Sequence, residues 1–186
     1  EDKPYCAAVA TAYNAYMPEY ERTKNLYNLV MDAIRTERKE KANQEWAEIL
    51  NQRGTGYIDI ALKDRNGNLH KLSDLQGKTV IIDFSSFEMP NSVQYIFALR
   101  ELYNKYHSRG LEIYQISLDQ NQMLWEESSA NIPWICVRDE KGANTTYVTT
   151  YNVQSIPTIF VMDKKGDIIS RSPGMDELNK LIAKSL

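Results

Sequence analysis

The chain has 186 residues, of which 42% are hydrophobic and 25% charged, and its formal net charge is −3 at pH 7. This length and composition are typical of a globular protein with one domain of ordinary size and an extension. The acidic balance argues against a nucleic-acid partner, and no uncharged apolar run approaches the ~20 residues that a membrane span needs.

The first 53 residues predict a helical extension. Residues 4–17 are rich in alanine and tyrosine and favour a short helix, and Pro18 suits the first position of a second helix. Apolar side chains recur at helical spacing in that second helix, and a polar run over residues 35–45 follows them. Four interpretations of this extension are open. It packs its apolar face on the rest of the protein without a further role, it covers a sheet edge, it mediates self-association, or it is the remnant of a larger upstream domain.

Residues 54–186 alternate between strand and helix patterns, which predicts one α/β domain. The predicted strands span residues 57–63, 69–72, 80–84, 111–118, 133–137, 159–162 and 168–171. The predicted helices span residues 91–107, a segment that contains Trp125, residues 143–151, and residues 175–186. Because a helix joins strands 80–84 and 111–118, the crossover rule makes these two strands parallel.

The turn after strand 80–84 is the first candidate site. Its sequence, FEMPN, supplies Phe87, Glu88, Met89, Pro90 and Asn91, and a helix begins directly after it. A strand that ends just before a helix leaves free backbone N–H groups and the positive end of the helix dipole at the turn. The pattern therefore favours a chemically active or ligand-binding position here.

The order of buried strand, Asp-Phe, two small residues, aromatic residue and proline over residues 80–90 resembles the active-site segment of thioredoxin-like proteins. The resemblance is strongest to the envelope thiol-disulfide oxidoreductases of the TlpA and ResA type, within the AhpC/TSA-like branch. Further matching features follow in the same order, namely the Gly-Lys lead-in at Gly77, Ser-Leu-Asp ending at Asp119, Ile-Pro-Thr around Pro157, and a Lys-Gly hairpin at Gly166. The resemblance covers residue 57 to the end of the chain.

This resemblance implies a thioredoxin-like fold, in which helices flank a central mixed sheet. It implies a cis-proline at Pro157 that faces the turn, where the preceding backbone binds an extended peptide. It also implies a periplasmic or cell-envelope location. Because the chain begins with Glu1 and no basic segment precedes an apolar core, we expect that a signal peptide or an upstream domain has been removed.

The cysteine positions of the family's Cys-x-x-Cys motif fall on Glu88 and Asn91. Thiol-disulfide exchange requires a thiolate and a second, resolving thiol, and neither residue supplies one. Glu88 is then either a capping or solvated acid, or an anion presented to a basic or amide-bearing partner. We therefore expect a redox-inactive module that binds an extended peptide or an envelope protein in a groove formed by residues 87–91 and by Ser155, Ile156 and Pro157.

A rival hypothesis is an enzyme of the thiol oxidoreductase or peroxidase type that uses Cys136. This cysteine lies in the apolar run of residues 134–137, where a thiol is usually an inert core group. Cys6 lies in the extension, where a free thiol and an intermolecular disulfide are both open interpretations. His70 and His107 show no metal-ligand spacing, and no phosphate-binding glycine motif occurs, so neither a metal nor another cofactor is expected.

Overall fold

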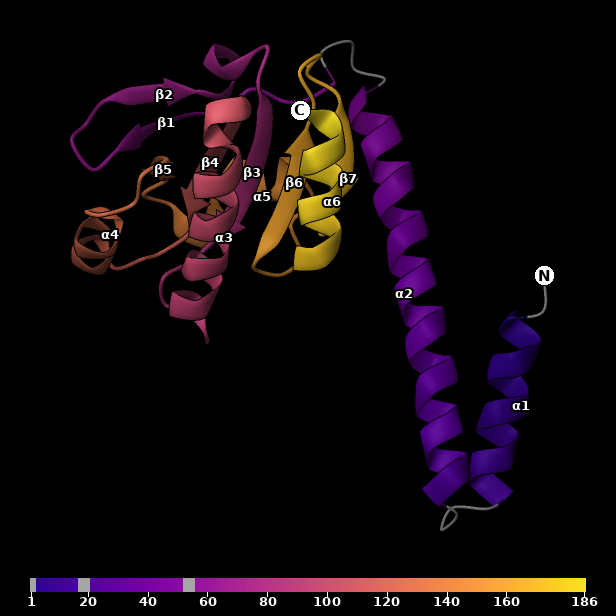
Figure 1. Cartoon of the computed structure of the whole chain (residues 1–186). Helices are drawn as coiled ribbons and strands as arrows, with labels where there is room; N and C mark the ends of the chain where they lie inside the picture. Colours follow the sequence, from indigo (N-terminus) through magenta and orange to yellow (C-terminus); the bar gives the residue numbers. More distant parts are fainter. Residues whose placement is uncertain (1–2, 17–20, 52–55) are drawn as a thin grey trace. The chain divides into compact units, whose positions relative to one another are not determined.

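A computed structural model of the chain describes residues 3–16, 21–51 and 56–186 (Figure 1). Contacts between residues divide the chain into two compact units, Glu1–Trp46 and Ala47–Leu186. The predicted boundary between residues 53 and 54 lies outside the described ranges.

The amino-terminal part is helical, as the sequence predicts. It contains α1 (Lys3–Tyr16) and α2 (Glu21–Asn51), whereas Pro18 lies outside the described residues. Ile34 of α2 is buried, while the side chains of Leu26 and Leu29 are 61% and 69% exposed, so α2 presents apolar surface to solvent. No helix in the described part of the chain is both long and apolar enough to cross a bilayer.

The second unit is built on a seven-stranded mixed sheet with the order β2-β1-β5-β4-β3-β6-β7 (Figure 1). Two parallel pairs form its centre, because β4 pairs with both β3 and β5. β6 pairs antiparallel with β3, and β1 pairs antiparallel with β5. The strands are β1 (Ala61–Asp64), β2 (Leu69–Lys71), β3 (Thr79–Ser85), β4 (Leu111–Ser117), β5 (Ile135–Arg138), β6 (Thr158–Met162) and β7 (Ile168–Arg171).

The sequence prediction of parallel strands 80–84 and 111–118 is confirmed by the register between β3 and β4. The prediction of a strand over residues 57–63 is partly wrong, because β1 begins only at residue 61. The segment before it is held by a side chain instead, since the Ile58 N–H donates to the Tyr151 hydroxyl at 3.2 Å. Closer to β1, the Leu72 N–H donates to the Ile60 carbonyl at 2.9 Å, so one backbone hydrogen bond extends the pairing to residue 60.

Helices cover both faces of the sheet. On one face, α3 (Ser92–Tyr106) and α6 (Met175–Ser185) pack over Ile81, Ile113 and Val161 in a single core cluster (Figure 1). On the other face, the rings of Phe84 and Phe160 contact that of Tyr151, which follows α5 (Thr146–Thr150). The remaining helices are α4 (Gln122–Ser129) and the 3-10 helices η1 (Leu72–Leu75), η2 (His107–Arg109) and η3 (Gly142–Asn144).

Strand directions bring three segments to one edge of the sheet. β3 and β4 are parallel and end together, since Ser85 is paired with Ser117. β6 is antiparallel to β3 and therefore begins at this edge, where Thr158 is paired with Phe84. The turn after β3, the loop after β4 and the segment before β6 consequently lie side by side.

Candidate functional site

A groove of about 510 Å³ lies at this edge, between the turn after β3 and the segment before β6. Its lining combines small polar, apolar and amide side chains with one carboxylate. The lining residues are Ser86, Glu88, Met89, Pro90, Leu118, Gln120, Ala143, Val148, Val153, Gln154, Ser155 and Ile156.

The structure thus brings five of the predicted site residues to one groove. They come from two segments that lie far apart in sequence. Of the other three, Phe87 is half-buried and Asn91 is exposed at the start of α3. The Ile156–Pro157 peptide bond is cis, as the family resemblance implies, and Pro157 is exposed beside the groove.

A buried carboxylate, that of Asp119, organises the turn. Its Oδ1 accepts from the Ser86 hydroxyl at 2.6 Å and from the Glu88 N–H at 3.1 Å. Its Oδ2 accepts from the Phe87 N–H at 3.1 Å and from the Ser117 hydroxyl. Asp119 has no solvent exposure. Two amides of the turn, those of Phe87 and Glu88, are therefore already hydrogen-bonded to an internal carboxylate, whereas the amides in the first turn of α3 are not bound to it.

Sequence reasoning did not include Asp119 among the site residues. It was recognisable only as part of the Ser-Leu-Asp feature of the family. The signal that points to a site role is positional, because a carboxylate directly after β4 lies beside the end of the parallel neighbour β3.

Glu88 and Asn91 have different roles in the turn. The Glu88 carboxylate is exposed, and no hydrogen bond or ion pair within residues 56–186 engages it. Asn91 adopts a left-handed conformation with φ of 61° and makes no side-chain cap hydrogen bond to α3. Glu88 is therefore a solvated acid, and Asn91 permits the chain reversal that starts the helix.

The backbone before Pro157 is open to a ligand. The Ser155 carbonyl accepts from the Thr158 hydroxyl at 2.5 Å. In contrast, neither the N–H nor the carbonyl of Ile156 has a partner in the described part of the chain, and the Ile156 side chain is 39% exposed. An extended peptide can satisfy such a donor and acceptor by adding strand-like hydrogen bonds.

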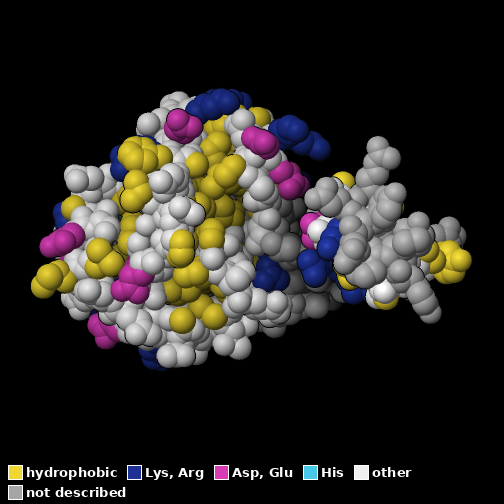
Figure 2. Space-filling model, turned by 90° about the horizontal axis from the view of Figure 1, so that it is seen from below, with side chains coloured by type: hydrophobic (Ala, Val, Ile, Leu, Met, Phe, Trp, Pro, Cys, Tyr) yellow, Lys and Arg dark blue, Asp and Glu magenta, His cyan; other side chains and the backbone are white. Residues whose placement is uncertain are grey.

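Apolar side chains continue beyond the groove onto α3. Val93 and Phe97 lie four residues apart near the start of α3, which is a helical spacing, and they are 63% and 62% exposed. Figure 2 views the molecule from below Figure 1, where the amino-terminal end of α3 lies, and shows hydrophobic side chains gathered in a band across this face. Exposed apolar surface of this kind marks interaction sites more often than bulk surface.

Beneath the turn, a second buried carboxylate belongs to β3. The hydroxyls of Tyr95 and Ser85 donate to Asp83 at 2.6 and 2.7 Å. The network continues to Gln115, whose side-chain amide donates to Ser85 at 3.0 Å and whose carbonyl accepts from Trp134 at 2.9 Å. Burial raises the pKa of Asp83 to about 6, although the two hydroxyl donors oppose this shift. Asp83 is therefore partly protonated near neutral pH.

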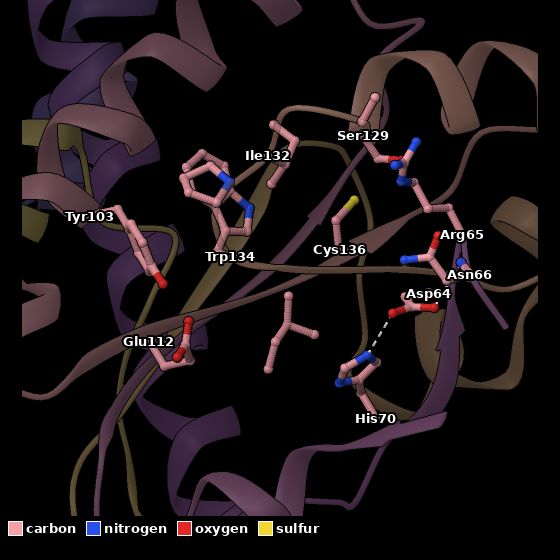
Figure 3. Close-up of a pocket in the computed structure, with 13 residues that line it drawn as sticks. Asp64, Arg65, Asn66, His70, Tyr103, Glu112, Ser129, Ile132, Trp134 and Cys136 are labelled. Atoms are coloured by element: carbon pink, nitrogen blue, oxygen red, sulfur yellow. Dashed lines mark hydrogen bonds and ion pairs between the residues drawn. The ribbon is translucent and has the colours of Figure 1, made fainter. Parts of the chain in front are cut away.

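Cys136 lines a different pocket of about 380 Å³ (Figure 3). Across this pocket, His70 and Asp64 form a pair with Nε2 and Oδ2 3.0 Å apart. The Cys136 side chain is only 7% exposed, and burial raises the pKa of its thiol to about 12. A thiol with this pKa is protonated at neutral pH and is a poor nucleophile. Cys6, in contrast, is exposed on α1.

Both histidines have a partner within the protein. Besides the His70 pair, the Nδ1 of His107 lies 3.1 Å from the Leu111 carbonyl. Among the side chains that the structure describes, no group of three or more His, Cys, Asp or Glu residues is placed to hold a metal ion.

Comparisons with known proteins agree with this geometry. A family model described as thioredoxin-like matches residues 77–168. The chain is similar to an uncharacterized thioredoxin-like protein from Bacteroides vulgatus of known solution structure, with 45% identity and a TM-score of 0.64, covering 69% of this chain and 85% of that one. It is also similar to the thiol-disulfide oxidoreductase ResA of Geobacillus kaustophilus, with 28% identity over 62% of this chain and 66% of ResA.

A third relative is the mouse nucleoredoxin, which is 29% identical over 61% of this chain. The matched region spans only 27% of that nucleoredoxin and 66% of ResA. The chain therefore corresponds to only part of the length of these relatives.

Proposed function

Because this chain belongs to the thioredoxin-like family and resembles its ResA-type thiol-disulfide oxidoreductases, we propose that it keeps the family's peptide-binding groove and acts by binding, without dithiol chemistry. The observation that carries the proposal is the turn itself. Glu88 and Asn91 stand where the dithiol would be, and Asp119 accepts the hydrogen bonds of the turn amides. The Ile156 backbone opposite remains open.

The two cysteines support this proposal by their positions. A redox site of the family type needs an accessible thiolate near a helix amino terminus. Cys136 is buried with its thiol pKa raised to about 12, and it lines a separate pocket from the groove. Cys6 lies on α1, outside the thioredoxin-like part. The rival enzyme that uses Cys136 would need this thiol to become exposed first.

The groove supports binding by two kinds of contact. Ile156 offers one backbone donor and one acceptor, which suit an extended segment. Met89, Val148 and Val153 offer apolar side-chain surface beside it. Main-chain hydrogen bonds supply affinity in such a mode, and the side-chain contacts supply selectivity.

Location and assembly belong to the same proposal. We place the protein in the periplasm or cell envelope, by its similarity to ResA, with a peptide or an envelope protein as its partner. The helical extension, residues 1–53, would serve self-association, since Tyr5, Leu26 and Leu29 expose apolar side chains. Analytical ultracentrifugation measures the number of chains per assembly for the full chain and for a chain lacking residues 1–53. We expect fewer chains per assembly after the deletion, and an equal number would contradict this part of the proposal.

The proposed function is tested by two measurements on the full chain. In an insulin-reduction assay with a chemical reductant, we expect no acceleration, and a relative with an intact Cys-x-x-Cys motif is the positive control. In an amide chemical-shift titration with a reduced and alkylated polypeptide, we expect shifts at residues 86–89 and 153–156. Insulin reduction at the rate of a ResA-type enzyme, or the absence of shifts at both segments, would overturn the proposal.

A further inference from the structure

We propose that the groove selects extended peptides that carry a lysine or arginine next to apolar residues, with Glu88 as the selecting group. This inference rests on the proposed binding function and names the chemistry of the ligand. It joins three observations, namely the charge of the groove, the unpaired Glu88 carboxylate and the open backbone of Ile156.

The charge of the groove is of one sign. Glu88 is the single ionisable side chain in its lining, and the other lining residues are neutral. An apolar groove with one carboxylate favours a ligand with one cation, because an anionic ligand would be repelled and a neutral one would leave the carboxylate partly desolvated without a partner.

Within residues 56–186, no Lys, Arg or His side chain forms an ion pair with this carboxylate. Arg138 reaches the loop after β4, but its guanidinium donates to the carbonyls of Asp119 and Gln120, at 2.9 and 3.0 Å. The Glu88 N–H is bound to Asp119, so the turn fixes the backbone of residue 88 while its side chain stays exposed. The carboxylate is therefore available to a ligand.

The open backbone and the apolar lining define the rest of the ligand. A segment that pairs with Ile156 is extended, so its successive side chains point in opposite directions. The side chains directed into the groove meet Met89, Val153 and Leu118, which favour apolar residues. A long basic side chain can lay its methylene groups along this surface while its charged end reaches Glu88.

A partly exposed ion pair contributes modestly to the binding free energy. The expected preference for a basic over a neutral peptide is therefore about threefold to tenfold in Kd. This preference should decrease as ionic strength rises, because salt screens exposed charges. The main-chain part of the affinity should depend little on salt.

The test uses three fluorescently labelled, end-blocked heptapeptides of alternating valine and serine whose central residue is lysine, glutamine or glutamate. Binding is measured by fluorescence anisotropy with the full chain, with E88Q, with E88K, and with E101Q as the matched control, since Glu101 is an exposed acid of α3 outside this groove. We expect the wild type and E101Q to prefer the lysine peptide, E88Q to lose the preference, and E88K to prefer the glutamate peptide.

The outcomes separate the two proposals. Equal affinity of the wild type for all three peptides, or a lysine preference that persists in E88Q, overturns this inference and leaves the binding function standing. Failure of every peptide to bind overturns both. Concentration-dependent shifts of the groove residues without any peptide would assign the groove to a second copy of the chain and would also overturn the inference.

Discussion

The Oδ1 atom of Asp119 lies 3.1 Å from the backbone nitrogen of Glu88 and accepts its hydrogen bond. In a thiol enzyme of this family, amides at a helix start stabilise a thiolate. Here a buried carboxylate from the neighbouring strand end binds the amides of Phe87 and Glu88, which precede α3. The turn is thereby stabilised from inside the protein, and its outer surface is left for binding.

The first prediction concerns the stability of this turn. D119A removes the acceptor of two amides and two hydroxyls, and of these donors the Glu88 N–H keeps a second acceptor, the Ser86 hydroxyl oxygen at 3.0 Å. We expect a loss of about 3 kcal/mol in the free energy of unfolding, measured by urea denaturation. D176A, at an exposed acid of α6, is the control and should change stability by less than about 0.5 kcal/mol. Equal stability of D119A and the wild type would contradict the role of Asp119.

The second prediction is a pH dependence from Asp83. The pKa of this carboxyl is raised from 3.8 to about 6 in the folded protein, so the native state binds the proton more tightly than the unfolded state. Its stability contribution is fully present below about pH 4 and is lost as pH rises through 6, in total about 3 kcal/mol. D83N should flatten this part of the profile and should be more stable than the wild type at pH 8.

Urea denaturation of the wild type and D83N at several pH values between 4 and 8 gives the difference that isolates this residue. A difference that does not change with pH would show that Asp83 is ionised throughout.

The third prediction separates the two thiols. In the native protein, a thiol reagent at pH 8 should label Cys6 rapidly and Cys136 slowly, because Cys136 is buried and its thiol pKa is raised to about 12. Both thiols should react rapidly in denaturant. C6S should therefore show almost no fast labelling, and rapid native labelling of C6S would revive the interpretation of Cys136 as a redox thiol.

The fourth prediction tests the left-handed residue at the start of α3. Asn91 has a φ of 61°, a region that asparagine and glycine tolerate and β-branched residues do not. N91V should lose about 1–2 kcal/mol of stability, and N91G should be close to the wild type. Q94V, at an exposed position within α3, is the control for the helix propensity of valine and should lose only a few tenths of a kcal/mol.

The fifth prediction reinstates the dithiol. In a C6S background, E88C combined with N91C should form an intramolecular disulfide, because the turn keeps the family's spacing and Pro90. The Asp119 carboxylate beside residue 88 should hold the pKa of the new thiol there above that of a similar turn without this acid. Adding D119N should lower that pKa, as measured by the pH dependence of alkylation. Two independent thiols under oxidising conditions would contradict the first part of the prediction.

Much of the fold was predictable from local pattern. Residues 80–84 and 111–118 are short segments rich in apolar residues, so their burial and their parallel pairing followed from composition and the crossover rule. Residues 57–60 misled the prediction, because β1 begins only at residue 61 and the Ile58 N–H donates to the Tyr151 hydroxyl instead of to a neighbouring strand. Periodicity reports which side chains are covered and not which backbone groups pair.

The sequence by itself determined the chemistry that the turn lacks, since the identities of Glu88 and Asn91 exclude a dithiol whatever the fold. Only the tertiary structure decided where the turn amides donate, which carboxylate is buried and which backbone stays open. Asp119 and Phe87 are 32 residues apart, and they meet because β3 and β4 end at the same edge of the sheet. The surroundings of a charge are set by segments distant in sequence, so no local pattern could assign Asp119 to the turn and leave Glu88 exposed to a ligand.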